Sequence, residues 1–376
     1  MSKRILYQIK FGSILIILFY MVLNVCSPQL GKLRDYGYTI ARDKDMLKGS
    51  QIESEVEKII LYSKKSENSD EKIIRNGVLV KRKNPKATIL LCHGFSCEKN
   101  DIAFLRHMFK DFNCMTFDFR AHGQNTDGQL CTLGKNEAFD VIAAAKFLRA
   151  HPDLQNLPLL VYAFSMGAVA SIEAQAKDST LFDAMILDCP FDSAENVIKR
   201  GLDNKKLSIF GYEFSIPGRR ILTKYVFHPY VQSFVKTFLK AVAKISMQNI
   251  KTMICPLHPS ESIKNVSVPC LFIHCKNDEK ISIDNIKSVY YNAASKYKKL
   301  WITNGRSHFD SYFYNPEKYA FTVRKFASKV VNGVIFKKNK HKILEDIPET
   351  DQIQTSLDMG QIKSLDKRRK KRRIHE

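Results

Sequence analysis

Ser165 stands where an apolar run gives way to a helical pattern. Residues 159–164 read LLVYAF, and residues 166–174 read MGAVASIEA. A serine on such a tight strand-to-helix turn lifts its hydroxyl clear of the sheet, and the first helical N–H points to the place where an oxyanion would form. The turn needs small residues two before and two after the serine, and Ala163 and Gly167 meet that need. These residues predict a nucleophilic serine.

The elements that would position this serine are short apolar runs that alternate with helical patterns. Their continuous apolarity favours strands buried on both faces, as in a parallel sheet covered by helices. Between two of the runs, residues 138–148 carry apolar side chains at helical spacing. Strand, helix and strand in this order are typical of the α/β class. The runs are residues 88–92, 114–119, 159–164, 184–188, 270–274 and 299–303.

Motifs around the serine turn resemble those of the α/β-hydrolase superfamily over residues 55–335. Residues 90–95, LLCHGF, resemble the strand and HG turn that supply one half of the family's oxyanion hole. Residues 118–125, DFRAHGQN, resemble its D-x-R-G-H-G-x-S turn, with Ala121 and Asn125 as departures. The serine turn itself reads A-x-S-x-G in place of G-x-S-x-G, which adds one methyl group at Ala163.

Two later motifs complete the resemblance. Residues 271–278, LFIHCKND, resemble the strand and loop that carry the acid, which places it at Asp278, with Glu279 as a rival. Residues 304–309, NGRSHF, resemble the final loop, which places the histidine at His308. The order serine, acid, histidine is that of the superfamily. Together with residues 188–191, DCPF, these motifs bring the chain nearest to bacterial serine aminopeptidase-like and prolyl-oligopeptidase-like hydrolases.

The resemblance implies an α/β-hydrolase fold and a serine hydrolase mechanism. His308 would take the proton of Ser165 and later give it to the leaving group, while Asp278 would hold the imidazole. The backbone N–H groups of Phe95 and Met166 would bind the oxyanion. We expect cleavage of a carboxylic ester, or less readily of an amide, through an acyl-enzyme on Ser165, with a small-molecule or lipid-like acyl substrate, no cofactor and no metal. A peptidase of the serine aminopeptidase type and a non-catalytic, membrane-tethered binding protein are the alternatives.

A long segment interrupts the alternation of strands and helices. Residues 191–266 are rich in aromatic side chains and show helical periodicity between residues 231 and 242. Connections in compact α/β sheets usually span about 2 to 6 residues. We therefore predict a helical cap insertion at residues 191–266, a hydrolase core at residues 55–190 plus 267–338, and a polar basic tail at residues 339–376.

The N-terminal residues 1–30 are predicted to form a signal anchor. Residues 11–25 are almost wholly apolar and follow the cations Lys3, Arg4 and Lys10. This order places the N-terminus in the cytoplasm and the catalytic domain outside it, either anchored or exported. Lipidation at Cys26, a removed signal peptide and a buried core helix are the alternatives.

The chain is strongly basic, with 60 Lys and Arg against 38 Asp and Glu and a formal net charge of +22. Seven of the cations form one run from Lys367 to Arg373. Such a run could bind a polyanion or direct a chain to the nucleus, but a solvated basic surface is the commoner role. We do not expect nucleic-acid binding. Nine cysteines are present, none in a C-x-x-C pair, and their spacing predicts neither a zinc site nor a disulfide pairing.

Overall fold

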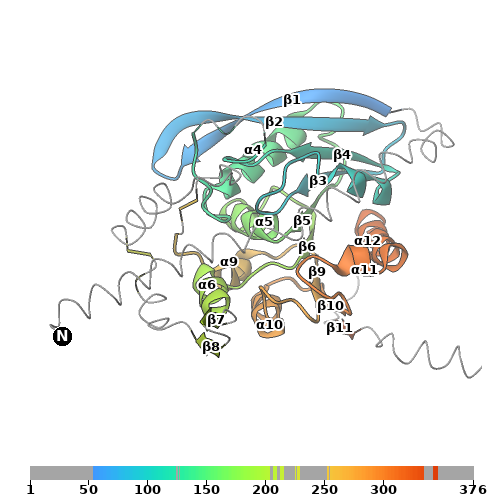
Figure 1. Ribbon diagram of the computed structural model, residues 1–376. Coiled ribbons are helices and arrows are strands. Elements are labelled where there is room, and N and C mark those ends of the chain that lie inside the picture. The colour runs from blue at the N-terminus through green and yellow to red at the C-terminus, as the bar shows by residue number, and fades with distance from the viewer. Residues whose placement is uncertain are drawn as a thin grey trace, which may run out of the picture.

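The computed structural model describes residues 54–123, 126, 128–203, 206–209, 212–215, 225, 227–228, 252–253, 255–333 and 342–345. Its centre is a nine-stranded sheet in the order β1-β2-β4-β3-β5-β6-β9-β10-β11 (Figure 1). From β4 to β11 in this order all neighbours run parallel, and β1 and β2 extend the sheet antiparallel at one border. The strands are β1 (Ser54–Ser66), β2 (Ser69–Arg82), β3 (Ala87–Cys92), β4 (Phe112–Phe117), β5 (Leu159–Phe164), β6 (Ala184–Asp188), β9 (Cys270–Cys275), β10 (Lys298–Thr303) and β11 (Lys342–Glu345).

Helices cover both faces of the sheet. On β5, Val161 and Ala163 enter a core shared with α4, α5 and α10, whereas Leu160 and Tyr162 enter a second core shared with η1 and α12. Side chains of a strand alternate between faces, so one strand can supply both cores. The helices are α4 (Glu137–Ala150), α5 (Met166–Lys177), α6 (Ala194–Asp203), α9 (Pro259–Ser262), α10 (Ile283–Asn292), α11 (Ser311–Tyr314) and α12 (Pro316–Val331), with 3₁₀ turns η1 (Ala103–Met108) and η2 (Ile263–Asn265).

The mostly parallel sheet flanked by helices is therefore confirmed. Every residue of β3, β4, β5, β6 and β9 is buried, which explains why these strands read as continuous apolar runs. The helix expected over residues 138–148 is α4, and the one expected after Ser165 is α5. All six predicted strands are present, with ends shifted by at most two residues.

Three strands of the nine-stranded sheet were not predicted. The β1–β2 hairpin joins two long strands in which buried residues such as Leu61 alternate with exposed ones such as Tyr62. Charged side chains are scattered through both strands, so neither reads as an apolar run. The short strand β11 falls within the expected polar tail, where Ile343 and Leu344 are flanked by charges. Its parallel pairing with β10 extends the sheet beyond residue 338, the predicted end of the core.

The expected cap is described only in part. Residues 191–266 contain α6 and a separate antiparallel hairpin of β7 (Lys206–Ile209) and β8 (Tyr212–Ser215), so the described part is not helical alone. The periodic segment at residues 231–242, the predicted anchor at residues 1–30 and the basic run from Lys367 to Arg373 lie outside the described residues. Within the described ranges, no helix has both the length and the apolar character needed to cross a bilayer.

A buried ion pair ties the β1–β2 hairpin to the rest of the core. Arg120 lies just after β4, with a side chain only 1% exposed, and Asp140 lies on α4 with none of its side chain exposed. The guanidinium donates from Nη2 to Asp140 Oδ1 at 2.7 Å and from Nε to Oδ2 at 3.0 Å. Its Nη2 also donates to the backbone carbonyl of Lys64 on β1 at 2.9 Å. One arginine thus joins a strand, a helix and a loop.

Removing the carboxylate of this pair should destabilise the fold. Asp140→Ala leaves the Arg120 guanidinium buried without its counter-ion, and such a change costs about 3 to 5 kcal/mol. Urea unfolding measures the free energy. The control is Asp111→Ala, which removes an exposed partner of Lys86 and should change that free energy by at most about 1 kcal/mol. Equal effects of the two substitutions would contradict the structural role of the buried pair.

Candidate active site

The backbone at Ser165 adopts a sharply constrained turn between β5 and α5. Its φ is 52° and its ψ is −123°, a conformation that side-chain-bearing residues rarely adopt. Backbone hydrogen bonds hold the turn, because Ser165 N donates to Asp188 O at 2.9 Å and Val169 N donates to Ser165 O at 3.1 Å. Because Ser165 directly follows β5, the turn places the serine at the carboxyl ends of the parallel strands. This is the geometry that the sequence predicts for the hydroxyl.

Gly167 explains why the turn demands small residues. A Cβ atom at this position would lie 2.4 Å from the carbonyl oxygen of His93 and 2.7 Å from that of Cys92. Both neighbours are backbone, so they cannot move aside as a flexible side chain can. The first turn of α5 therefore packs directly on the loop that follows β3. Ala163 is fully buried in the adjoining core, where its single methyl group is accommodated.

Three predicted residues meet at this edge of the sheet. His308 Nε2 lies 2.8 Å from Ser165 Oγ, and His308 Nδ1 lies 2.7 Å from Asp278 Oδ2. Asp278 comes from the loop after β9, and His308 comes from the loop after β10. Because β5, β9 and β10 are parallel within one sheet, their carboxyl ends share one edge. The arrangement can relay a proton between a hydroxyl and an imidazole whose orientation a carboxylate fixes.

Asp278 is held as an ionised acceptor. Its Oδ1 accepts the backbone N–H groups of Lys280 at 2.8 Å and Ile281 at 2.9 Å. Burial acts to raise the pKa of this carboxyl, but the charge and hydrogen bond of His308, together with the charge of His274 and the N–H of Ile281, bring the pKa below its ordinary value. The contact with His308 belongs to Asp278 and not to the rival Glu279. The carbonyl oxygen of Glu279 accepts from Arg200 Nε at 3.0 Å.

The loop that carries Phe95 is fixed by a neutral histidine. His93 Nε2 accepts the backbone N–H of Phe119 at 3.1 Å, and its Nδ1 lies 2.8 Å from the Gly94 carbonyl oxygen. Complete burial lowers the pKa of His93 well below its ordinary value, so the ring stays neutral and Nε2 can accept. The half-buried Phe95 packs edge-on against His122. Hydrogen bonds and ring packing thus hold the loop where the Phe95 N–H would be needed.

Two residues beside the triad were not assigned to the site from the sequence. Cys189 Sγ lies 3.8 Å from His308 Nε2, and Cys189 has a φ of 44°. The preceding Asp188 is fully buried, and burial raises the pKa of its carboxyl. A hydrogen bond from Tyr319 lowers this pKa, whereas the negative charge of Asp278 raises it further, and the result is a pKa of about 7. The Tyr319 hydroxyl donates to Asp188 Oδ2 at 2.7 Å. The DCPF motif at residues 188–191 was the only sequence signal for this pair.

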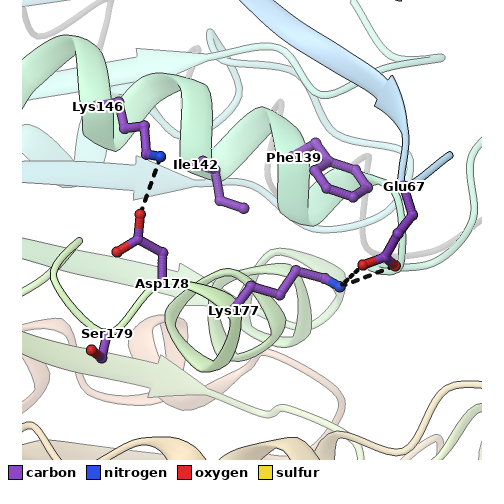
Figure 2. Close-up of a pocket in the computed structure, with 7 residues that line it drawn as sticks. All are labelled: Glu67, Phe139, Ile142, Lys146, Lys177, Asp178 and Ser179. Atoms are coloured by element: carbon purple, nitrogen blue, oxygen red, sulfur yellow. Dashed lines mark hydrogen bonds and ion pairs between the residues drawn. The ribbon is translucent and has the colours of Figure 1, made fainter. Parts of the chain in front are cut away.

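An open pocket of about 560 Å³ lies apart from these residues, between α4, α5 and the β1–β2 turn (Figure 2). Two ion pairs line it. Lys146 Nζ lies 3.2 Å from Asp178 Oδ2, and Lys177 Nζ lies 2.9 Å from Glu67 Oε1. The charges drawn in Figure 2 therefore neutralise one another in pairs, and we place no chemistry there.

Comparisons with known proteins identify the family of the chain and agree with its fold. Residues 83–309, more than half of the chain, match the family described as serine aminopeptidase, S33. An uncharacterised protein of Bacillus subtilis, YqkD, is 27% identical over 242 residues, which are 64% of this chain and 70% of that protein. The esterase Pf2001 of Pyrococcus furiosus superposes with a TM-score of 0.53 at 19% identity, covering 74% of this chain and 93% of its own. The 2,6-dihydroxy-pseudo-oxynicotine hydrolase gives a TM-score of 0.51 at 12% identity, covering 78% and 72%.

The lowered pKa of Asp278 predicts a pH-dependent contribution to stability. A carboxyl whose pKa is lower in the folded state stabilises the fold above its unfolded pKa of about 3.9. That contribution disappears as pH falls through the lower folded value. The free energy of unfolding of the wild type minus that of Asp278→Asn should therefore decrease from pH 6 to pH 3 in denaturant titrations. The exposed Asp284→Asn is the control, and an Asp278→Asn difference that stays constant over this range would contradict the ion pair.

Proposed function

Because the chain belongs to the serine aminopeptidase S33 family of the α/β-hydrolase superfamily, we propose that it hydrolyses a carboxylic ester through an acyl-enzyme on Ser165. One observation carries the proposal. Ser165 Oγ, His308 and Asp278 form a continuous chain with contacts of 2.8 and 2.7 Å. The expected substrate is a small-molecule or lipid-like acyl ester.

The reaction begins with proton transfer. His308 Nε2 takes the proton of Ser165 as its oxygen attacks the substrate carbonyl carbon, and the imidazolium is stabilised by Asp278. The tetrahedral intermediate then collapses, the carbon–oxygen bond to the leaving group breaks, and His308 protonates the departing alkoxide. Water next attacks the acyl-enzyme, with His308 again as the base, and releases the acid while the serine regains its proton.

The oxyanion of the intermediate needs donors that are already in place. We assign this role to the backbone N–H groups of Met166 and Phe95. The support is the packing at Gly167, which seats the N-terminus of α5 on the loop after β3. Loss of one such donor typically costs about 3 to 4 kcal/mol of transition-state stabilisation.

Ester cleavage is preferred over aminopeptidase activity because of the carboxylates near Ser165. An aminopeptidase needs an accessible anionic group for the free amine of its substrate. Asp188 and the triad residue Asp278, two described carboxylates close to Ser165, are both buried and engaged by Tyr319 and His308. A non-catalytic binding role is disfavoured because all three residues required for acyl transfer are present and in contact.

A fluorophosphonate probe tests the nucleophile directly. Such probes phosphonylate activated serines, so the wild type should be labelled and Ser165→Ala should lose more than about 90% of the label because Ser165 carries the reactive oxygen. The matched control is Ser171→Ala, since Ser171 is a buried serine of the same helix whose hydroxyl donates to the Gly167 carbonyl at 2.8 Å. Labelling is read by gel fluorescence.

The same proteins distinguish the alternatives. With p-nitrophenyl acyl esters and aminoacyl p-nitroanilides, we expect faster turnover of the esters. Preference for the anilides would favour a peptidase, and equal labelling of the wild type and Ser165→Ala would contradict the role of Ser165. A folded wild type with neither label nor turnover would favour the binding protein.

We also propose that residues 1–30 anchor the enzyme in a membrane with the catalytic domain extracytoplasmic. The support is the apolar run at residues 11–25 behind Lys3, Arg4 and Lys10. The full chain should remain with membranes after an alkaline carbonate wash, whereas a chain beginning at residue 31 should not. A chain ending at residue 362 should behave as the full chain does, because carbonate strips surface-bound proteins. If the chain ending at residue 362 no longer stayed with the membranes, membrane attachment would be assigned to the basic tail.

A further inference from the structure

A cysteine lies close to the histidine of the triad, and both side chains are of the kind that binds metal ions. Cys189 Sγ lies 3.8 Å from His308 Nε2, the same nitrogen that contacts Ser165 Oγ at 2.8 Å. The donor atoms of Cys189, Asp278 and His308 all lie within 4.8 Å of one another, and all three residues are buried. A thiol and a hydroxyl thus both lie close to one imidazole nitrogen, although Cys189 and His308 are far apart in the sequence.

The spacing of the sulfur and the nitrogen suits a single metal ion. Zinc binds sulfur at about 2.3 Å and imidazole nitrogen at about 2.0 to 2.1 Å, and a tetrahedral angle between such bonds separates the two atoms by about 3.6 Å. The observed 3.8 Å is close to that value. An ion between Cys189 and His308 would therefore require little movement of either side chain. Ser165 Oγ, now 2.8 Å from Nε2, would have to move outward to the roughly 3.3 Å that separates two such ligands of one tetrahedral ion.

Asp278 would support the site without binding the ion itself. Its Oδ2 faces His308 Nδ1 at 2.7 Å, and its Oδ1 already accepts the backbone N–H groups of Lys280 and Ile281. A carboxylate that accepts the Nδ1–H of a ligating histidine fixes the tautomer in which Nε2 presents its lone pair to the metal. The same contact that prepares His308 to act as a base thus prepares it to act as a ligand.

The electrostatic surroundings favour a cation at this point. A carboxylate oxygen of Asp278 lies within 4.8 Å of Cys189 Sγ. Negative charge next to the sulfur favours a divalent cation, and the ion replaces the thiol proton when the thiolate binds it.

We propose that Cys189 Sγ, His308 Nε2 and Ser165 Oγ bind a soft divalent cation of the Zn²⁺ or Cd²⁺ class, and that the bound ion reversibly blocks the hydrolase. Binding releases the Cys189 thiol proton to solvent and involves no change of oxidation state. The ion occupies the lone pair that His308 needs for proton transfer. Thiolate and imidazole ligands disfavour Mg²⁺ and Ca²⁺, which prefer oxygen. The inhibitory consequence rests on the proposed function, whereas the binding itself does not.

Cobalt(II) tests the binding independently of activity. Thiolate bound to Co²⁺ produces a charge-transfer absorption in the near ultraviolet. We expect the full-length wild type to show this band, Zn²⁺ to abolish it, and Cys189→Ala to reduce it at least tenfold. Cys189→Ser keeps the side-chain volume, so it should fold and also lose the band. Two controls should keep it: Cys270→Ala, a buried thiol on β9, and Cys255→Ala, a half-buried one.

Inhibition tests the consequence. Zn²⁺ should suppress p-nitrophenyl ester turnover by the wild type at concentrations at least tenfold lower than those needed for Cys189→Ala, while Mg²⁺ should have no effect at the same concentrations. Absence of the cobalt band in the wild type, or an undiminished band in both Cys189 variants, would overturn the site. A Cys189-dependent band in a wild type without any turnover would support the site and contradict the proposed ester hydrolysis.

Discussion

The contact between the first turn of α5 and the backbone after β3 is the constraint on which the site depends. Gly167 leaves no room for a side chain against the carbonyls of Cys92 and His93. At this separation the chain turns from β5 into α5 with Ser165 at a positive φ. A larger residue would push the helix away from the loop, moving the hydroxyl and the N-terminus of the helix together. Nucleophile and predicted oxyanion donors are therefore positioned by one packing contact.

Parallel strands then supply the partners of the serine. The loops after β9 and β10 begin at the same edge of the sheet, so Asp278 and His308 reach Ser165 although 143 residues separate the serine from the histidine. The carboxylate is ionised because His308 and two backbone N–H groups compensate for its burial. The fold thus brings together groups that would not meet in solution, at separations suited to proton transfer.

Sequence patterns predicted those elements whose structure is determined by residues close together in the chain. Fully buried strands such as β5 leave continuous apolar runs, and the strand-to-helix turn leaves small residues around Ser165. The β1–β2 hairpin escaped prediction because one of its faces is solvent-exposed and charged residues interrupt the alternation. The proximity of Cys189 and His308 was not predicted for another reason. It depends on how β6 and the loop after β10 lie in space, 119 residues apart, and no local pattern reports that.

The central claim is that acyl transfer passes through Ser165, and the mass of the acid-quenched enzyme tests it most directly. During turnover of a p-nitrophenyl ester, the account predicts that a fraction of the enzyme gains the mass of the acyl group and that peptide mapping places this group on Ser165. The account would be contradicted if the enzyme turned over the ester while Ser165 never carried the acyl group, or if the acyl group mapped to another residue.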